Sequence, residues 1–207
     1  MKSVKWSMFN LHCCSMALDL SISLLTTPFV IFPAIAGYPL GVLKEVGVPT
    51  GAQIYFVVSL FAVVGISVLG IFENRFFVLF AENSFWKYLR IPFLTVNYIL
   101  CFLFFVPPYL MIPDQKLALE DVYKKLSEFQ TLPTWITNAP VFVLSTNATY
   151  AFLSIFFMII FIIGEVVIFI FLLALNTKCL ARKMHLSKTT LRIQRKFLNA
   201  LHVQVPY

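Results

Sequence analysis

The chain has 207 residues, of which 60% are hydrophobic and 12% are charged, and its formal net charge at pH 7 is +7. Soluble domains carry about a quarter charged residues, and a soluble protein of this length would lack the polar surface needed to cover so much apolar material. The composition therefore excludes an ordinary soluble domain and indicates a membrane protein.

Four apolar runs are long enough to cross a bilayer as helices, which requires about 20 residues each. In chain order they are Leu11–Ala36, Ala52–Phe72, Ile91–Ile112 and Tyr150–Leu175. A last apolar run, 197–207, is shorter and is predicted to be a truncated fifth span. The runs do not alternate polar and apolar residues as barrel strands do, so we expect an all-α membrane protein with a single domain over residues 1–207.

Two acidic residues lie inside these runs, Asp19 in the first and Glu165 in the fourth. A carboxylate near the bilayer centre costs a few kcal/mol, so we expect both to be buried polar groups that face the bundle interior. His12, Asn97 and Ser or Thr groups are available there as partners. A functional interpretation is an ion site or a contact that changes with conformation, and the alternative is a satisfied buried polar group.

A polar cluster interrupts the apolar segment IFENRFFVLF, residues 71–80, at the end of the second run. It consists of Glu73, Asn74 and Arg75. A helix that leaves the hydrocarbon at this point can pair or solvate these side chains at little cost. The cluster is therefore either a boundary marker or a latch that holds the helix ends together until a signal releases it.

The long loop after the third run contains a segment with helical periodicity, Asp114–Phe129. We predict an amphipathic helix lying on the bundle or on the membrane surface. Its apolar positions are Leu119, Val122, Tyr123 and Leu126.

Loop charges predict the orientation, because Lys and Arg accumulate on the cytoplasmic side of membrane proteins. Most of the 16 Lys and Arg residues lie in the N-terminal stretch, in the loop after the second run and in the segment Asn176–Lys196. We therefore expect these parts to be cytoplasmic. Asn147, in the glycosylation sequon NAT, then falls on the outer side, where it is a candidate N-glycosylation site. The basic segment either only sets this topology or also binds a partner.

Residues that carry catalytic chemistry are not grouped in this sequence. The three histidines are scattered, and we recognise no Ser-His-Asp set, no glycine-rich phosphate loop and no paired carboxylates within one span. We therefore expect a protein that is not an enzyme, with no catalytic, cofactor-binding or metal site and no nucleic-acid partner. No outer disulfide is expected, since the cysteines lie in spans or on the cytoplasmic side: Cys13, Cys14, Cys101 and Cys179.

Five segments, in order along the chain from Ser3 to Pro206, carry a resemblance to a known family. They are SVKWSMFNLH, ALDLSISLLTTPFVIFPAIAGYPLG, FENRF, PVFVLS and KTTLRIQRKFLNALHVQVP. Together they resemble the nematode seven-transmembrane chemoreceptors of serpentine receptor class H. In that family SVKW follows the first transmembrane helix and QRKFLNALHVQVP opens the sixth. The resemblance implies a partial seven-helix receptor bundle, with helices two to five and the start of helix six.

The resemblance also implies a function: a G-protein-coupled chemosensory receptor that detects small environmental molecules and acts through a heterotrimeric G protein. Glu73, Asn74 and Arg75 would form an ionic switch at the cytoplasmic end of helix three, and Asp19 would be the buried acid of helix two. The third cytoplasmic loop would contact the G protein through Arg182, Lys183, Lys188, Arg192, Arg195 and Lys196. The expected location is the plasma membrane of chemosensory neurons, or the endoplasmic reticulum if the truncated chain is retained.

One departure from the family pattern lies in the long outer loop, where Thr134 stands at a position at which we expect a cysteine. Two other interpretations stay open. One is a small transporter or channel subunit in which Asp19 and Glu165 are ion ligands or proton carriers. The other is a truncated product without independent activity.

Overall fold

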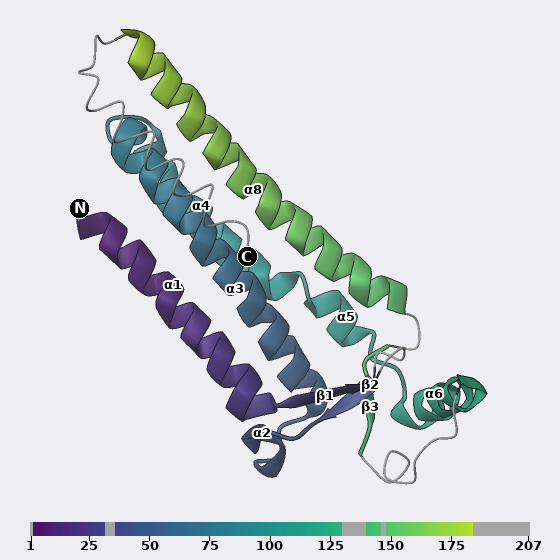
Figure 1. Ribbon diagram of the computed structural model, residues 1–207. Coiled ribbons are helices and arrows are strands. Elements are labelled where there is room, and N and C mark those ends of the chain that lie inside the picture. Colours follow the sequence, from purple (N-terminus) through teal and green to yellow (C-terminus); the bar gives the residue numbers. More distant parts are fainter. Residues whose placement is uncertain (1, 32–35, 130–139, 146–147, 184–207) are drawn as a thin grey trace.

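The computed structural model describes residues 2–31, 36–129, 140–145 and 148–183 (Figure 1). Four long helices, α1, α3, α4 and α8, run side by side, and a small sheet lies at one end of them (Figure 1). The central helix is α3, which packs against each of the other three. The described part of the chain is thus a helical bundle with a small cap, in agreement with the all-α membrane fold predicted from the run lengths.

Each long helix is apolar enough to cross a membrane, over Val4–Thr26, Thr50–Ala81, Trp86–Leu110 and Phe152–Cys179. Two of them end in a π-helical turn, and the third span combines two helices. The elements are α1 (Lys2–Leu20) with η1 (Ser21–Thr26), α3 (Thr50–Phe76) with η2 (Phe77–Ala81), α4 (Trp86–Leu103) with α5 (Val106–Leu110), and α8 (Ala148–Lys183).

The first span differs from the prediction, which placed it over Leu11–Ala36. The helix begins at Lys2 and ends at Thr26, and the chain then leaves the helix at Thr27 with a positive φ of 37°. Pro28 follows, and a proline cannot donate the backbone hydrogen bond that would continue the helix. The sequence stays apolar beyond Thr27 because it enters a β-hairpin that is itself partly buried. The length of an apolar run alone does not distinguish a continuing helix from a buried hairpin.

A three-stranded antiparallel sheet, which the sequence did not predict, caps this end of the bundle. It contains β1 (Pro28–Ile31), β2 (Ala36–Pro39) and β3 (Phe142–Val143) in the order β1-β2-β3. Pro28 pairs with Pro39 in the hairpin, and Gly37 pairs with Phe142 across the second interface. The short helix α2 (Val42–Glu45) then leads into α3.

The predicted amphipathic helix is confirmed as α6 (Gln115–Phe129). Its apolar face packs against the sheet, where Ala118 and Val122 form one buried cluster with Ile31, Val141 and Val143. The helix therefore belongs to the cap and holds the sheet in place.

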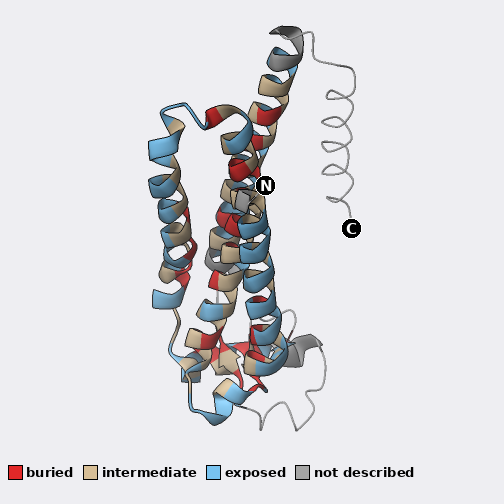
Figure 2. Cartoon of the chain, turned by 90° about the vertical axis from the view of Figure 1, so that its left-hand side faces the viewer, coloured by how far each residue is buried: buried red, intermediate tan, exposed pale blue. Residues whose placement is uncertain are grey.

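The core of the bundle lies along one face of α3. Its buried members on that helix are Ala62, Ile66, Leu69 and Phe72, which meet Cys101 of α4 and Met158, Phe169 and Leu173 of α8. Figure 2 shows buried residues toward the interior and many exposed ones on the outward faces. Large apolar side chains dominate these exposed positions on α8, as expected for a helix whose surroundings are lipid.

Candidate functional site

Four polar side chains meet where α3 ends and α4 begins, at the end of the bundle opposite the sheet. We call Glu73, Asn74, Trp86 and Arg90 the end cluster. The Glu73 side chain has no exposed surface, and Asn74 is 1% exposed. A buried carboxylate is tolerated in a protein only when it is paired and hydrogen-bonded, so the contacts of Glu73 decide what this cluster is.

Both oxygens of the Glu73 carboxylate accept hydrogen bonds from α4. Arg90 donates from Nε to Oε2 over 2.9 Å, and Trp86 donates from its indole Nε1 to Oε1 over 2.9 Å. Arg90 also donates from Nη2 to Asn74 Oδ1 over 2.7 Å, and its guanidinium lies 4.6 Å from the centre of the Phe77 ring. Charge-assisted bonds of this kind are stronger than neutral ones, so the cluster ties the end of α3 firmly to the start of α4.

The local sequence explains why these side chains meet. Trp86 and Arg90 are four residues apart on α4, so both lie on the same face of that helix. A short turn separates η2 from α4, and in it the Ser84 hydroxyl accepts a hydrogen bond from the backbone N–H of Trp86 over 3.2 Å. This turn starts α4 beside the end of α3, which brings that face against Glu73.

The sequence singled out Glu73, Asn74 and Arg75, and the structure places the first two in the end cluster. The cation bonded to Glu73 is Arg90. Residues two apart on a helix do not face each other, so Arg75, which is half-buried, points in a different direction from Glu73. Sequence reasoning missed Trp86 and Arg90, although their i, i+4 spacing at the start of an apolar run is a usable signal.

A second polar contact joins α4 to α8 within the span. Asn97, which is 2% exposed, donates from Nδ2 to Glu165 Oε1 over 3.5 Å and to the carbonyl of Phe93 over 3.1 Å. Asn97 Oδ1 and Glu165 Oε2 have no hydrogen-bond partner in the described part of the chain. A cavity of about 400 Å³ between α3, α4 and α8 is lined by both Glu165 and Trp86, so this contact borders the end cluster.

Asp19 differs from the expectation that it is buried. Its side chain is exposed, because the face of α1 turned toward α3 includes Leu18 and Ser21, which are buried instead. Glu165 pairs with Asn97 of α4, so the described contacts do not unite the two acids in one ion site.

A third polar contact, which the sequence did not suggest, joins three helices. Asn10 of α1 donates from Nδ2 to the Tyr98 hydroxyl of α4 over 2.9 Å and to the Ser67 hydroxyl of α3 over 3.2 Å. The Ser67 and Tyr98 oxygens are 3.3 Å apart. Hydrogen bonds between membrane helices are a usual means of holding them in register.

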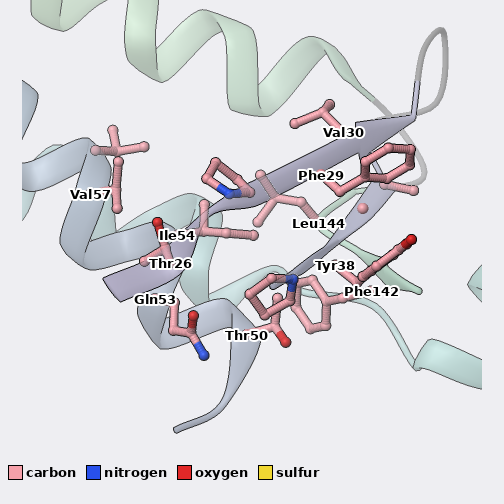
Figure 3. Close-up of a pocket in the computed structure, with 15 residues that line it drawn as sticks. Thr26, Phe29, Val30, Tyr38, Thr50, Gln53, Ile54, Val57, Phe142 and Leu144 are labelled. Atoms are coloured by element: carbon pink, nitrogen blue, oxygen red, sulfur yellow. The ribbon is translucent and has the colours of Figure 1, made fainter. Parts of the chain in front are cut away.

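At the sheet end, a cavity of about 230 Å³ lies between the β1–β2 hairpin, the first turns of α3 and the residues around β3 (Figure 3). Most of its lining is aliphatic or aromatic. Its polar lining residues include Thr26, Thr50 and Gln53, of which Gln53 is 2% exposed. Run lengths and charges gave no sign of this cavity, because it forms only when the hairpin folds over α3.

The remaining predicted site residues lie in the last turn of α8 or outside that helix. Arg182 and Lys183 belong to its last turn, at the same end of the bundle as the end cluster and the N-terminus of α1 (Figure 1). Other predicted features lie outside the described residues: Asn147, Lys188, Arg192, Arg195, Lys196 and the last apolar run, 197–207.

Comparison with known families gives a match over residues 1–206 to the family described as the serpentine type 7TM GPCR chemoreceptor Srh. The comparisons with curated proteins and with solved structures gave no match. The family is one of multi-pass membrane receptors and not of enzymes, in accord with the four apolar helices. The chain belongs to the Srh family of serpentine seven-transmembrane G-protein-coupled chemoreceptors.

Proposed function

We propose that this chain supplies helices two to five of a chemosensory receptor that detects small molecules at the sheet end and acts on a heterotrimeric G protein at the other end. The family match supports the receptor class. The arrangement of the described residues suits a transmitter, since a cavity lies at one end of α3 and the end cluster at the other. From Gln53 to Glu73 the helix spans about 30 Å at 1.5 Å per residue.

The observation that carries this proposal is the pair formed by Glu73 and Arg90, 2.9 Å apart, between two helices that pack side by side. A receptor switches when helices move between two packed arrangements of similar free energy. We assign Glu73, Asn74 and Arg90 to the switch, with Arg90 as the cation that holds α3 to α4 in the resting arrangement. Release of this pair would free the ends of both helices to move.

The proposed G-protein contact is the basic segment after α8, together with Arg182 and Lys183 in its last turn. Arg182 and Lys183 lie in the last turn of α8, at the end of the bundle at which the end cluster lies. The other residues of the proposed G-protein contact are Lys188, Arg192, Arg195 and Lys196.

The proposed location of the receptor is the plasma membrane of chemosensory neurons.

The test uses the chain extended to seven helices with the remaining helices of a close relative, expressed with a reporter G protein. Arg90→Ala should raise ligand-independent signalling per receptor at the cell surface, because the resting contact is lost. Lys87→Ala is the matched control, since Lys87 is an exposed basic residue one turn before Arg90. Equal basal signalling in the two variants and the parent would contradict the switch.

A second experiment compares the 207-residue chain expressed alone with the chain extended to seven helices. The 207-residue chain expressed alone is expected to stay in the endoplasmic reticulum and to give no G-protein response, whereas the extended chain reaches the surface. Ion flux through vesicles that contain the chain alone would instead favour a channel or transporter subunit.

A further inference from the structure

We propose that the cavity at the sheet end binds a small, neutral, mostly apolar molecule with one hydrogen-bond donor, and that Gln53 Oε1 accepts the hydrogen bond from that donor. The inference rests on the proposed function, in which the chain detects a small molecule. It adds the chemical class of that molecule and the residue that selects it.

The walls of the cavity determine its polarity. They come from three parts of the chain: the end of η1 with the hairpin, the start of α3, and β3 with the residue after it (Figure 3). None of the described residues that line the cavity is charged, and the apolar ones include Phe29, Ile54, Val57 and Leu144. A charged molecule would lose its hydration there without gaining an opposite charge, so the site favours neutral molecules.

The volume of the cavity restricts the size of the ligand. At about 230 Å³ it is smaller than the pockets that take drug-sized molecules, which are roughly 300–1,000 Å³. A dry apolar cavity of about 150 Å³ in another protein binds benzene. By that comparison this cavity takes one ring or a short chain, with roughly six to ten non-hydrogen atoms.

Gln53 provides the point of polar recognition. Its Nε2 donates to the backbone carbonyl of Val48 over 2.8 Å, which fixes the orientation of the amide. Its Oε1 is buried and accepts no hydrogen bond from any described residue. Figure 3 shows that oxygen on the side of the amide nearer Thr26. A buried acceptor without a partner is unfavourable, so a bound molecule that donates to it gains affinity over one that cannot.

The hydroxyl of Thr26 does not donate a hydrogen bond to Gln53 Oε1 in place of a ligand. It already donates to the Ser21 carbonyl over 2.8 Å. The backbone is closely packed at two glycines, Gly37 in the cavity wall and Gly41 just after the hairpin. At Gly37 a Cβ would collide with the backbone of Phe29, and at Gly41 it would collide with that of Leu25. A larger residue at either position would therefore have to shift the hairpin.

The experiment compares two probes of nearly equal shape, benzyl alcohol and toluene, which differ in a hydroxyl group. Each is titrated into the 207-residue chain in lipid nanodiscs and followed by ligand-observed NMR, with empty nanodiscs subtracted. We expect benzyl alcohol to bind about tenfold more tightly than toluene, which corresponds to about 1.4 kcal/mol. In Gln53→Met the ratio should fall to within about twofold, because only the alcohol loses its acceptor.

Glu120→Met is the control. Glu120 lies at the same end of the bundle, at an exposed position of α6, and does not line the cavity. This variant should keep the preference for benzyl alcohol. A second variant, Val57→Phe, fills the cavity and should remove the binding of both probes even if Gln53→Met fails to fold.

The inference is overturned if the parent chain binds neither probe, if it binds both equally, or if the preference survives in Gln53→Met or Val57→Phe. Failure of the proposed function has a different signature. In that case the alcohol preference depends on Gln53, but the extended receptor gives no G-protein response to any ligand. A receptor that signals to other ligands without any Gln53-dependent preference would keep the function and lose this site.

Discussion

The Nε atom of Arg90 lies 2.9 Å from the Oε2 atom of Glu73, a side chain with no exposed surface. Trp86 donates a hydrogen bond to the other carboxylate oxygen, so two donors from one face of α4 bind the carboxylate of Glu73. Removal of one member of a buried pair leaves the other without compensation in a medium that solvates charge poorly. The end cluster is therefore where single substitutions should have the largest effects.

Arg90→Ala should lower the free energy of unfolding by about 3 kcal/mol, because Glu73 then stays buried without its cation. The measurement is thermal or denaturant unfolding of the chain in nanodiscs. Lys87→Ala, at an exposed position of the same helix, should change stability by less than about 0.5 kcal/mol. Equal losses in the two variants would show that the pair does not stabilise the bundle.

Two of the carboxylates within the spans, Glu73 and Glu165, should respond differently to neutralisation. Glu73→Gln should destabilise the chain by about 2 kcal/mol, because a charge-assisted bond from Arg90 is lost and an amide cannot accept on both atoms. Glu165→Gln should change stability by less than about 0.5 kcal/mol or raise it, since a glutamine can donate to Asn97 Oδ1, which has no described partner. Similar losses in both variants would contradict this distinction.

Tyr98→Phe should cost about 1 kcal/mol of stability, because the hydroxyl accepts from Asn10 and contacts Ser67. The same substitution at Tyr88, which is 74% exposed, should be nearly neutral. A double variant with Asn10→Ala measures the coupling, and additive losses in Tyr98→Phe and Asn10→Ala would mean that the hydrogen bond is energetically silent.

Gly65→Leu should destabilise the packing of α3 on α8 by roughly 1–3 kcal/mol, the range for inserting atoms into a packed interface. A Cβ at Gly65 would lie 3.1 Å from Ile162 Cδ1, so a larger side chain must push α8 away. At Gly70 a Cβ meets no atom within 4 Å, and Gly70→Leu should be tolerated. The measurement is the free energy of unfolding of both variants under the same conditions. Equal values for Gly65→Leu and Gly70→Leu would contradict close packing at Gly65.

The orientation can be measured in sealed endoplasmic reticulum vesicles, whose outer face corresponds to the cytoplasm. A membrane-impermeant maleimide should label Cys179, an exposed residue near the end of α8, without permeabilisation. A cysteine introduced by Glu45→Cys, at an exposed position of α2, should react only after the vesicles are opened. The reverse pattern would invert the orientation and remove the end cluster from the cytoplasmic side.

The four helices could be predicted from sequence because hydrocarbon leaves few choices to an apolar run of this length. The hairpin could not, since the residues from Pro28 onward are as apolar as a helix, and only the turn at Thr27 separates the two structures. Glu73 and Asn74 stand out because they interrupt an apolar run. Their pairing with Arg90 depends on how α4 packs against α3, and the residues around Glu73 do not predict that packing.

The partners of Glu73 both follow it in the chain, at Trp86 and Arg90. During synthesis α3 therefore reaches the membrane before α4 does, and its acid has no counterpart until α4 emerges from the ribosome. The simplest route is for α3 and α4 to leave the translocon together as a helical hairpin, with the pair formed at the moment of release. A nascent chain arrested while α4 is still inside the ribosome should keep α3 at the translocon, and one arrested after α4 has emerged should let both helices partition into lipid.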